Sequence, residues 1–325
     1  MPDWIRDPEL GDGFVQTTLK FPPDYDGEVT ATLVRNEPLV SGAQVAVLYL
    51  HGFIDYFFQK HAAQAFNRAG YNFYGLDLRK YGRSLGSAPH PNFCKEFEEY
   101  FPEITAAIDI LTGVEGHSAV VLNAHSTGAL PAALYARTGE RSDRVAKLIF
   151  NSPFLEFPQG SAAAHLGAVV GGLFPFQRRQ KPVNPWYAKS LHVNSAACTD
   201  CKGEWHFNKS WKPIEGFDAF FGWIRAVVRV QDRIKDGLNL KQPVLVMHSD
   251  KSLKGDTWSD AFHRADLVLN VNDIKRLSPN LGRRVEIREI AGGKHDLALS
   301  QEDARAKCLQ VMLEWISRPV HDRPG

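Results

Sequence analysis

The sequence has little that would mark a secreted, membrane-spanning or nucleic-acid-binding protein. Its 325 residues include only four cysteines, too few for a disulfide scaffold in a chain of this length. The 38 basic and 37 acidic residues give a net charge of +1, and this balance does not indicate binding to a polyanion or to a membrane surface. No apolar run is long enough to span a bilayer, and the N-terminal MPDWIRDPEL lacks a basic segment followed by an apolar core. We therefore expect a cytoplasmic protein with reduced thiols, no nucleic-acid partner and no integral membrane span. The sequence leaves its oligomeric state open.

Two of the cysteines, Cys198 and Cys201, form a Cys-Thr-Asp-Cys pair between His192 and His206. Cysteine and histidine are zinc ligands, but this spacing matches zinc signatures poorly, and no second pair of this kind supports a site. A disulfide or ordinary packing is the better prediction. We expect no metal and no other cofactor.

Short apolar runs alternate with longer helical patterns, which is typical of α/β architecture with a mostly parallel sheet. An opening antiparallel pair is predicted at 14–20 and 29–35, and further strands at 45–50, 72–78, 120–123, 147–150, 243–248 and 285–290. Helices are predicted at 57–69, 97–112, after residue 127, and at 217–234, 274–281 and 301–316.

The pattern changes between residues 153 and 241, which are rich in glycine, proline and aromatic residues and show no clear strand alternation. We therefore divide the chain into a core, residues 1–152 and 242–325, and an insertion at 153–241. This insertion is expected to lie on the sheet as a helical lid.

The stretch AVVLNAHSTGALPAAL, residues 119–134, places Ser126 between a buried strand and a helix. A sharp strand-to-helix turn strains the backbone of the turn residue, and residues two positions away must be small, as Ala124 and Gly128 are. The helix N-terminus then directs backbone N–H groups at an oxyanion formed beside the serine. This is the pattern of a nucleophile elbow. A helix-capping serine is the commoner explanation, so the prediction depends on the partners of Ser126.

A serine nucleophile needs a base, and the segment IAGGKHDL supplies His295 after the last predicted strand. An oxyanion hole needs a second N–H from the loop after an earlier strand, where the chain reads LHGFI. Gly52 lets this backbone approach closely, so the N–H of Phe53 would pair with that of Thr127. His51 is then structural.

Four motifs now stand in order: HGF at 51–53, DLRKYGRS at 77–84, AHSTG at 124–128 and GGKHD at 292–296. They resemble the motifs of α/β-hydrolases of the monoacylglycerol lipase, lysophospholipase and serine aminopeptidase group, over nearly the whole chain outside 153–241. The resemblance implies the α/β-hydrolase fold: a mostly parallel central sheet flanked by helices, with an inserted lid. Two departures are Lys80, where the family has glycine, and Ala124 in place of a commoner glycine. Alanine is small, so the elbow is expected to survive.

The resemblance places the acid of the triad after the strand at 243–248, in a pattern H-G-x-x-D. This chain has Ser252 at the expected position. Residues 253–265 look inserted, and the following Asp-Leu-Val-Leu is similar to the family's D-x-V-V. We therefore predict Asp266 as the displaced acid, with Asp250 and Asp256 as alternatives. Asp296 adjoins His295 and is poorly placed to orient the same imidazole.

These residues predict a lipase-like serine esterase that cleaves small-molecule carboxylic esters of apolar acyl groups through an acyl-enzyme. The aromatic residues of 153–241 favour an apolar pocket, although several must pack against one another. One alternative is a serine aminopeptidase acting on short peptides, with Glu204 or Glu215 gripping the α-ammonium group. Another is a catalytically silent hydrolase fold used for binding, against which the intact Ser126 and His295 argue.

Overall fold

The computed structural model describes residues 1–158, 160–179 and 185–319, so part of the predicted insertion (159 and 180–184) lies outside the described residues. Within the described residues nine strands form one mixed sheet, in the order β1-β2-β3-β5-β4-β6-β7-β10-β11. A separate two-stranded ribbon pairs β8 with β9. The strands are β1 Ile5–Arg6, β2 Phe14–Asp24, β3 Gly27–Asn36, β4 Val45–Leu50, β5 Asn72–Asp77, β6 Ala119–His125, β7 Val145–Asn151, β8 Arg178–Arg179, β9 Ala219–Phe220, β10 Val244–Ser249 and β11 Val285–Ile290.

The sheet is parallel from β5 to β11 and antiparallel at the edge formed by β1, β2 and β3. Strands β4 and β11 have the bounds predicted from the sequence, whereas β6 extends beyond the predicted 120–123 to His125. Almost every residue of β4, β5, β6, β7 and β10 is buried. Continuous apolar runs are the signature of parallel strands covered on both faces, and this made these strands predictable.

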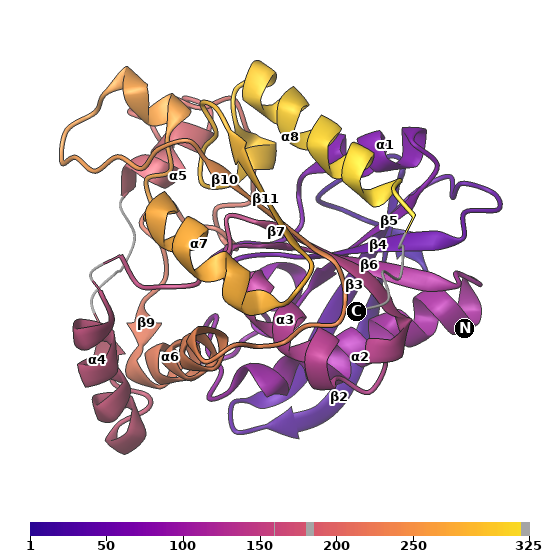
Figure 1. Cartoon of the computed structure of the whole chain (residues 1–325), viewed down its shortest axis with the longest axis horizontal. Coiled ribbons are helices and arrows are strands. Elements are labelled where there is room, and N and C mark those ends of the chain that lie inside the picture. Colours follow the sequence, from indigo (N-terminus) through magenta and orange to yellow (C-terminus); the bar gives the residue numbers. More distant parts are fainter. Residues whose placement is uncertain (159, 180–184, 320–325) are drawn as a thin grey trace.

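Helices cover both faces of the sheet (Figure 1). Helix α8 packs beside α1 on one face, and α2, α3 and α6 lie together on the other. Successive side chains of β4 point to opposite faces of the sheet. Those of Ala46, Leu48 and Leu50 pack into one buried hydrophobic cluster, and those of Val47 and Tyr49 pack into the other. The helices are α1 Lys60–Arg68, α2 Phe101–Asp109, α3 Ala129–Thr138, α4 Ser161–Leu173, α5 Pro185–Leu191, α6 Phe221–Lys235, α7 Val271–Leu277 and α8 Glu302–Ile316.

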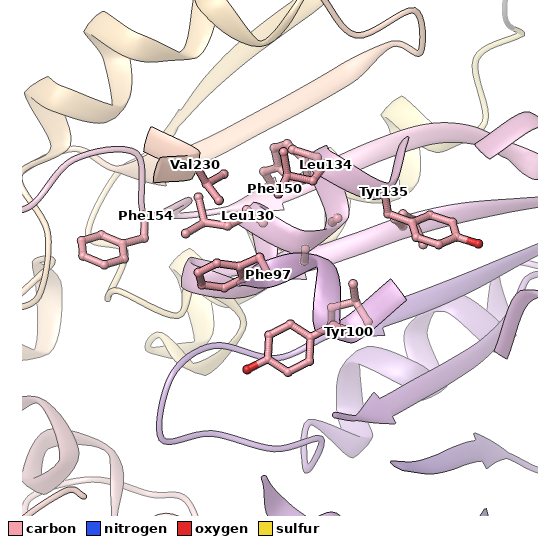
Figure 2. Packing of buried hydrophobic residues seen from close by; sticks show 14 of the residues in the cluster. Phe97, Tyr100, Leu130, Leu134, Tyr135, Phe150, Phe154 and Val230 are labelled. Atoms are coloured by element: carbon pink, nitrogen blue, oxygen red, sulfur yellow. The ribbon is translucent and has the colours of Figure 1, made fainter. Parts of the chain in front are cut away.

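The core beneath α3 connects the sheet to the region predicted as an insertion. Figure 2 shows Phe150 of β7 meeting Leu130 and Leu134 of α3, with Phe154, three residues after β7, and Val230 of α6 close by. All five side chains are buried. Helix α6 is therefore packed onto the same core as the sheet, which fixes its position relative to the end of β6.

Helix α1 begins three residues later than the sequence predicted, at Lys60 instead of residue 57. The N–H of Phe57 donates to Asp77 Oδ1 at 2.8 Å, and that of Phe58 donates to Gln59 Oε1 at 3.0 Å. These side-chain acceptors hold the backbone in a turn and compete with the first helical hydrogen bonds.

Lys80 has a φ of 65°, the left-handed conformation that glycine adopts most easily. Its ammonium lies 3.1 Å from Asp24 Oδ2 and 2.6 Å from Asp26 Oδ2, and 4.3 Å from the ring centre of Tyr25. The departure from the family's glycine thus keeps the turn geometry and adds a buried ion-pair network.

Residues 153–241 contain α4, the β8–β9 ribbon, α5 and α6, with α4 packed beside α6 (Figure 1). In this segment Cys198 and Cys201 form a disulfide, one of the two outcomes favoured over a zinc site, so the expectation of reduced thiols is wrong for this pair. Cys94 and Cys308 are buried free thiols. No helix of the described residues combines the length and apolar character needed to cross a bilayer.

Candidate active site

Ser126 follows directly on β6 and has a φ of 53°, the strained backbone that an elbow requires. The chain then makes a 3₁₀ turn, Ser126–Gly128, and enters α3. A β-carbon on Gly128 would lie 2.4 Å from the carbonyl oxygen of His51, and one on Gly52 would lie 3.1 Å from the Ser126 Cβ. Ala124 is fully buried in β6. Small residues at these positions allow the loop after β4 to lie against the elbow.

Ser126, His295 and Asp266 form one hydrogen-bonded chain. The distance from His295 Nε2 to Ser126 Oγ is 2.9 Å, and from His295 Nδ1 to Asp266 Oδ2 it is also 2.9 Å. All three side chains are buried. If Nδ1 carries the proton and donates it to Asp266, Nε2 is free to accept the serine hydroxyl proton.

The position of Asp266 is fixed by backbone hydrogen bonds between the two ends of the loop that precedes it. The N–H of Leu253 donates to the Asp266 carbonyl, and the N–H of Asp266 donates to the Lys251 carbonyl, both at 3.0 Å. Its Oδ1 accepts the backbone N–H groups of Val268 at 2.7 Å and Leu269 at 2.8 Å. One carboxylate oxygen is therefore held by the backbone, and the other is directed at His295.

The other aspartates considered from the sequence have different surroundings. Asp250 accepts the N–H of Gly292 at 2.8 Å, and Asp256 is exposed. The carboxylate of Asp296 accepts Gln59 Nε2 at 3.0 Å and Asn151 Nδ2 at 2.7 Å. The structure therefore brings Asp266, and neither alternative, to the histidine.

The loop after β4 carries the predicted oxyanion residue Phe53 past the elbow. His51 Nδ1 lies 2.9 Å from the Gly52 carbonyl, and its Nε2 accepts the Leu78 N–H at 3.1 Å. Burial lowers the pKa of His51, so the ring is neutral and holds the loop. These contacts match the structural role expected for His51, and the close approach at Gly52 and Gly128 brings the loop of Phe53 next to the elbow.

Residues of the segment 153–241 that sequence reasoning did not single out also reach this region. Trp223 of α6 stacks on Phe53 with ring centroids 4.2 Å apart, and Tyr187 of α5 lies edge-on to His295 at 5.5 Å. The ammonium of Lys212 lies 2.7 Å from Asp55 Oδ1 in the loop after β4. A lysine or an aromatic residue in a segment without periodicity gives no signal that it reaches this site.

Comparison with known proteins gives both the family and the fold. The family model described as serine aminopeptidase, S33, matches residues 42–299. A search of curated protein sequences found no significant match to the chain.

The structural matches include a soluble variant of monoglyceride lipase from Saccharomyces cerevisiae in complex with a substrate analog, with a TM-score of 0.66 and 14% identity over 93% of this chain and 96% of that one. A monoacylglycerol lipase from Paleococcus ferrophilus matches with a TM-score of 0.61 and 20% identity, over 93% and 98% of the two chains. A carboxyl esterase from Bacillus coagulans in complex with glycerol has a TM-score of 0.66 and 14% identity, over 93% and 97%. At these identities the matches establish the α/β-hydrolase fold predicted from the motifs, and the family model covers well over half of the chain. The chain belongs to the serine aminopeptidase S33 family of α/β-hydrolases.

Proposed function

We propose that the protein is a serine hydrolase that cleaves carboxylic esters of apolar acyl groups, in the manner of a monoacylglycerol lipase or lysophospholipase-like esterase. The observation that carries the proposal is the hydrogen-bonded chain from Ser126 through His295 to Asp266, with the serine strained at the start of a helix. A helix-capping serine needs neither a buried histidine nor a carboxylate behind it.

The first step follows from these contacts. His295 Nε2 takes the hydroxyl proton as Ser126 Oγ attacks the ester carbonyl carbon. Asp266 keeps the imidazole in the required tautomer and stabilises the imidazolium that forms. The N–H groups of Phe53 and Thr127 donate to the tetrahedral oxyanion, His295 protonates the leaving alcohol, and water then hydrolyses the acyl-enzyme with His295 again acting as base.

The segment 153–241 is proposed to be the lid that selects the substrate. Tyr187 and Trp223 lie against the base and the oxyanion loop, and the N–H of Phe154 donates to the Ser126 carbonyl at 3.2 Å. Ser126 itself is only 7% exposed. Aromatic side chains packed against the site favour apolar acyl chains.

The name of the matching family suggests a second candidate function, that of an aminopeptidase acting on short peptides. That reaction needs a free carboxylate to bind the substrate's ammonium group. Glu204 is instead paired with Arg305 of α8 at 2.5 Å, and Glu215 is exposed. Glu204 is thus not a free carboxylate, and a silent binding fold would have no need of an intact hydrogen-bonded triad.

A substrate series separates the candidates. Wild type and Ser126→Ala are assayed on p-nitrophenyl esters of increasing acyl length and on aminoacyl p-nitroanilides. The proposal predicts ester cleavage that rises with acyl length and is lost in the variant. Cleavage of anilides with silent esters would favour the aminopeptidase, and a folded wild type that turns over neither set would favour the binding protein.

A further inference from the structure

Four charged or titratable side chains meet in the interior behind the triad: Asp55, His125, Asp296 and Lys212, called here the buried charge cluster. Lys212 Nζ lies 2.7 Å from Asp55 Oδ1, and His125 Nδ1 lies 3.4 Å from Asp55 Oδ2. One ligand-type atom from each of Asp55, His125 and Asp296 lies within 4.8 Å of the other two. All four residues are at least nine-tenths buried.

The cluster joins three of the loops that carry candidate catalytic groups: those of Phe53, Ser126 and His295. Asp55 comes two residues after Phe53, His125 directly precedes Ser126, and Asp296 directly follows His295. The ring centroids of His125 and His295 are 4.9 Å apart. Lys212 is the one member from the segment 153–241, so it links the proposed lid to all three loops.

The charges of the cluster balance when His125 is protonated. Burial works against the charged form of His125, but Asp296 and Asp55 outweigh it and raise the pKa of this histidine. Burial likewise disfavours the Asp55 carboxylate, but Lys212 and His125 outweigh it and hold the pKa of Asp55 well below its usual range. Two carboxylates then face one imidazolium and one ammonium, which is the pairing that makes buried charge tolerable.

A metal ion fits the same residues poorly. The ammonium of Lys212 already lies against Asp55, and a second cation there would be repelled. Both oxygens of Asp296 accept amide N–H groups, from Asn151 and Gln59. Both oxygens of Asp296 and Oδ1 of Asp55 are thus already bound to protein partners, and the neutralising positive charge comes from the Lys212 side chain.

We infer that Lys212 is a positioning residue that supplies the positive charge needed to neutralise the cluster. It thereby holds the loop of Phe53, the elbow at Ser126 and the loop of His295 in their relative positions under the proposed lid. The inference rests on the proposed function and deepens it. The lid is then part of the catalytic electrostatics as well as a substrate filter, because the reacting histidine lies beside a cluster whose net charge the lid sets.

Other titratable groups around the cluster carry no charge that would replace Lys212. Burial raises the pKa of Tyr49 and Tyr187 well above the usual range, and burial lowers that of His51. Lys294 points away, with Nζ 2.5 Å from the Ser190 carbonyl. Asp266 faces His295 directly and is unchanged in the experiment below.

The test compares pH profiles of kcat/KM for wild type, Lys212→Met and the double variant Asp55→Asn/Lys212→Met. Removing Lys212 leaves the cluster with a net negative charge beside His295, which favours the imidazolium form. The acid limb should therefore move to higher pH by about one unit, and kcat should fall. The double variant restores neutrality, and its acid limb should return to the wild-type position.

Lys189→Met is the matched control, since Lys189 lies in the same segment and pairs with Asp200 near the surface. Its profile should match that of wild type. A Lys212→Met enzyme with lower activity but an unshifted acid limb would overturn the inference, as would a double variant that keeps the shift. An inactive wild type that fluorophosphonate does not label would instead remove the proposed function on which the inference rests.

A measurement on the unchanged protein covers the case in which Lys212→Met fails to fold. Nitrogen-15 NMR of the histidine rings reports protonation directly, with His125→Gln used to assign the signal. The account predicts that the pKa of His125 is raised, so both ring nitrogens carry protons in most molecules at pH 6.5. A neutral His125 at that pH would contradict the charge balance and overturn the inference.

Discussion

Ser252 and Asp266 lie side by side as partners in a parallel β-bridge, although the whole of 253–265 separates them in the sequence. Residues 253–265 therefore form a loop whose two ends lie next to each other. Ser252 occupies the position at which the resemblance led us to expect the acid, and its hydroxyl donates to the Leu269 carbonyl at 2.7 Å. The carboxylate beside His295 is instead that of Asp266, at the other end of this loop.

Asp266→Asn tests this displacement. The amide presents a donor or a neutral acceptor to His295 Nδ1 and no longer stabilises the imidazolium, so kcat should fall by roughly 10³–10⁴-fold. Asp250→Asn and Asp256→Asn are the controls and should each change kcat less than about threefold. An equal or greater loss in either control would move the acid to that residue.

Gly128→Ala tests the close approach at the elbow. The added β-carbon would lie 2.4 Å from the His51 carbonyl oxygen and 2.6 Å from that of Leu50, and both are backbone atoms that cannot rotate away. We expect a stability loss of about 1–3 kcal/mol or more, and slower fluorophosphonate labelling because the oxyanion loop is pushed from the serine.

Gly113→Ala is the matched control for that variant, since a β-carbon there meets nothing within 4 Å. Its unfolding free energy should stay equal or rise by up to about 1 kcal/mol. Chemical denaturation of the two variants checks both expectations, and a Gly128→Ala protein as stable and reactive as wild type would contradict the packing argument.

Lys80→Gly and Lys80→Ala separate the backbone from the side chain at the position where the family has glycine. Both variants lose the ion pairs with Asp24 and Asp26, but only alanine keeps the cost of a left-handed backbone. Lys80→Gly should therefore be the more stable of the two by roughly 1 kcal/mol. The same pair of changes at the helical residue Arg229 should give the opposite order.

Lys294 gives the protein a defined pH dependence of stability. Burial lowers its pKa from 10.5 to about 8. Between these values the unfolded chain binds the proton that the folded protein has released, so unfolding free energy rises with pH. Relative to Lys294→Met, wild type should gain up to roughly 3 kcal/mol as pH rises from below 8 to above 10.5. Urea titrations across that range check it, and a constant difference between the two proteins would contradict it.

Much of the fold could be predicted because its buried parallel strands are continuous apolar runs, as β4 and β10 illustrate. The elbow was predictable for a different reason, since its strain demands small residues around Ser126. Helix α1 was placed too early because the Asp77 carboxylate that holds Phe57 is distant in the sequence.

The buried charge cluster could not be predicted, because Asp55, His125, Lys212 and Asp296 share no local pattern and each resembles an exposed residue. Their burial is tolerable only because they meet, and only the folded chain brings them together. The disulfide was left open for a similar reason, since cysteines three positions apart also suit plain packing.

The central claim is that Ser126 is a nucleophile activated by His295 and Asp266. Its most direct test is reaction with a fluorophosphonate, followed by intact-mass measurement and peptide mapping of wild type and Ser126→Ala. The account predicts one adduct per chain, mapped to Ser126, and none on the variant. A wild type that stays unlabelled, or an adduct that persists in Ser126→Ala, would contradict it.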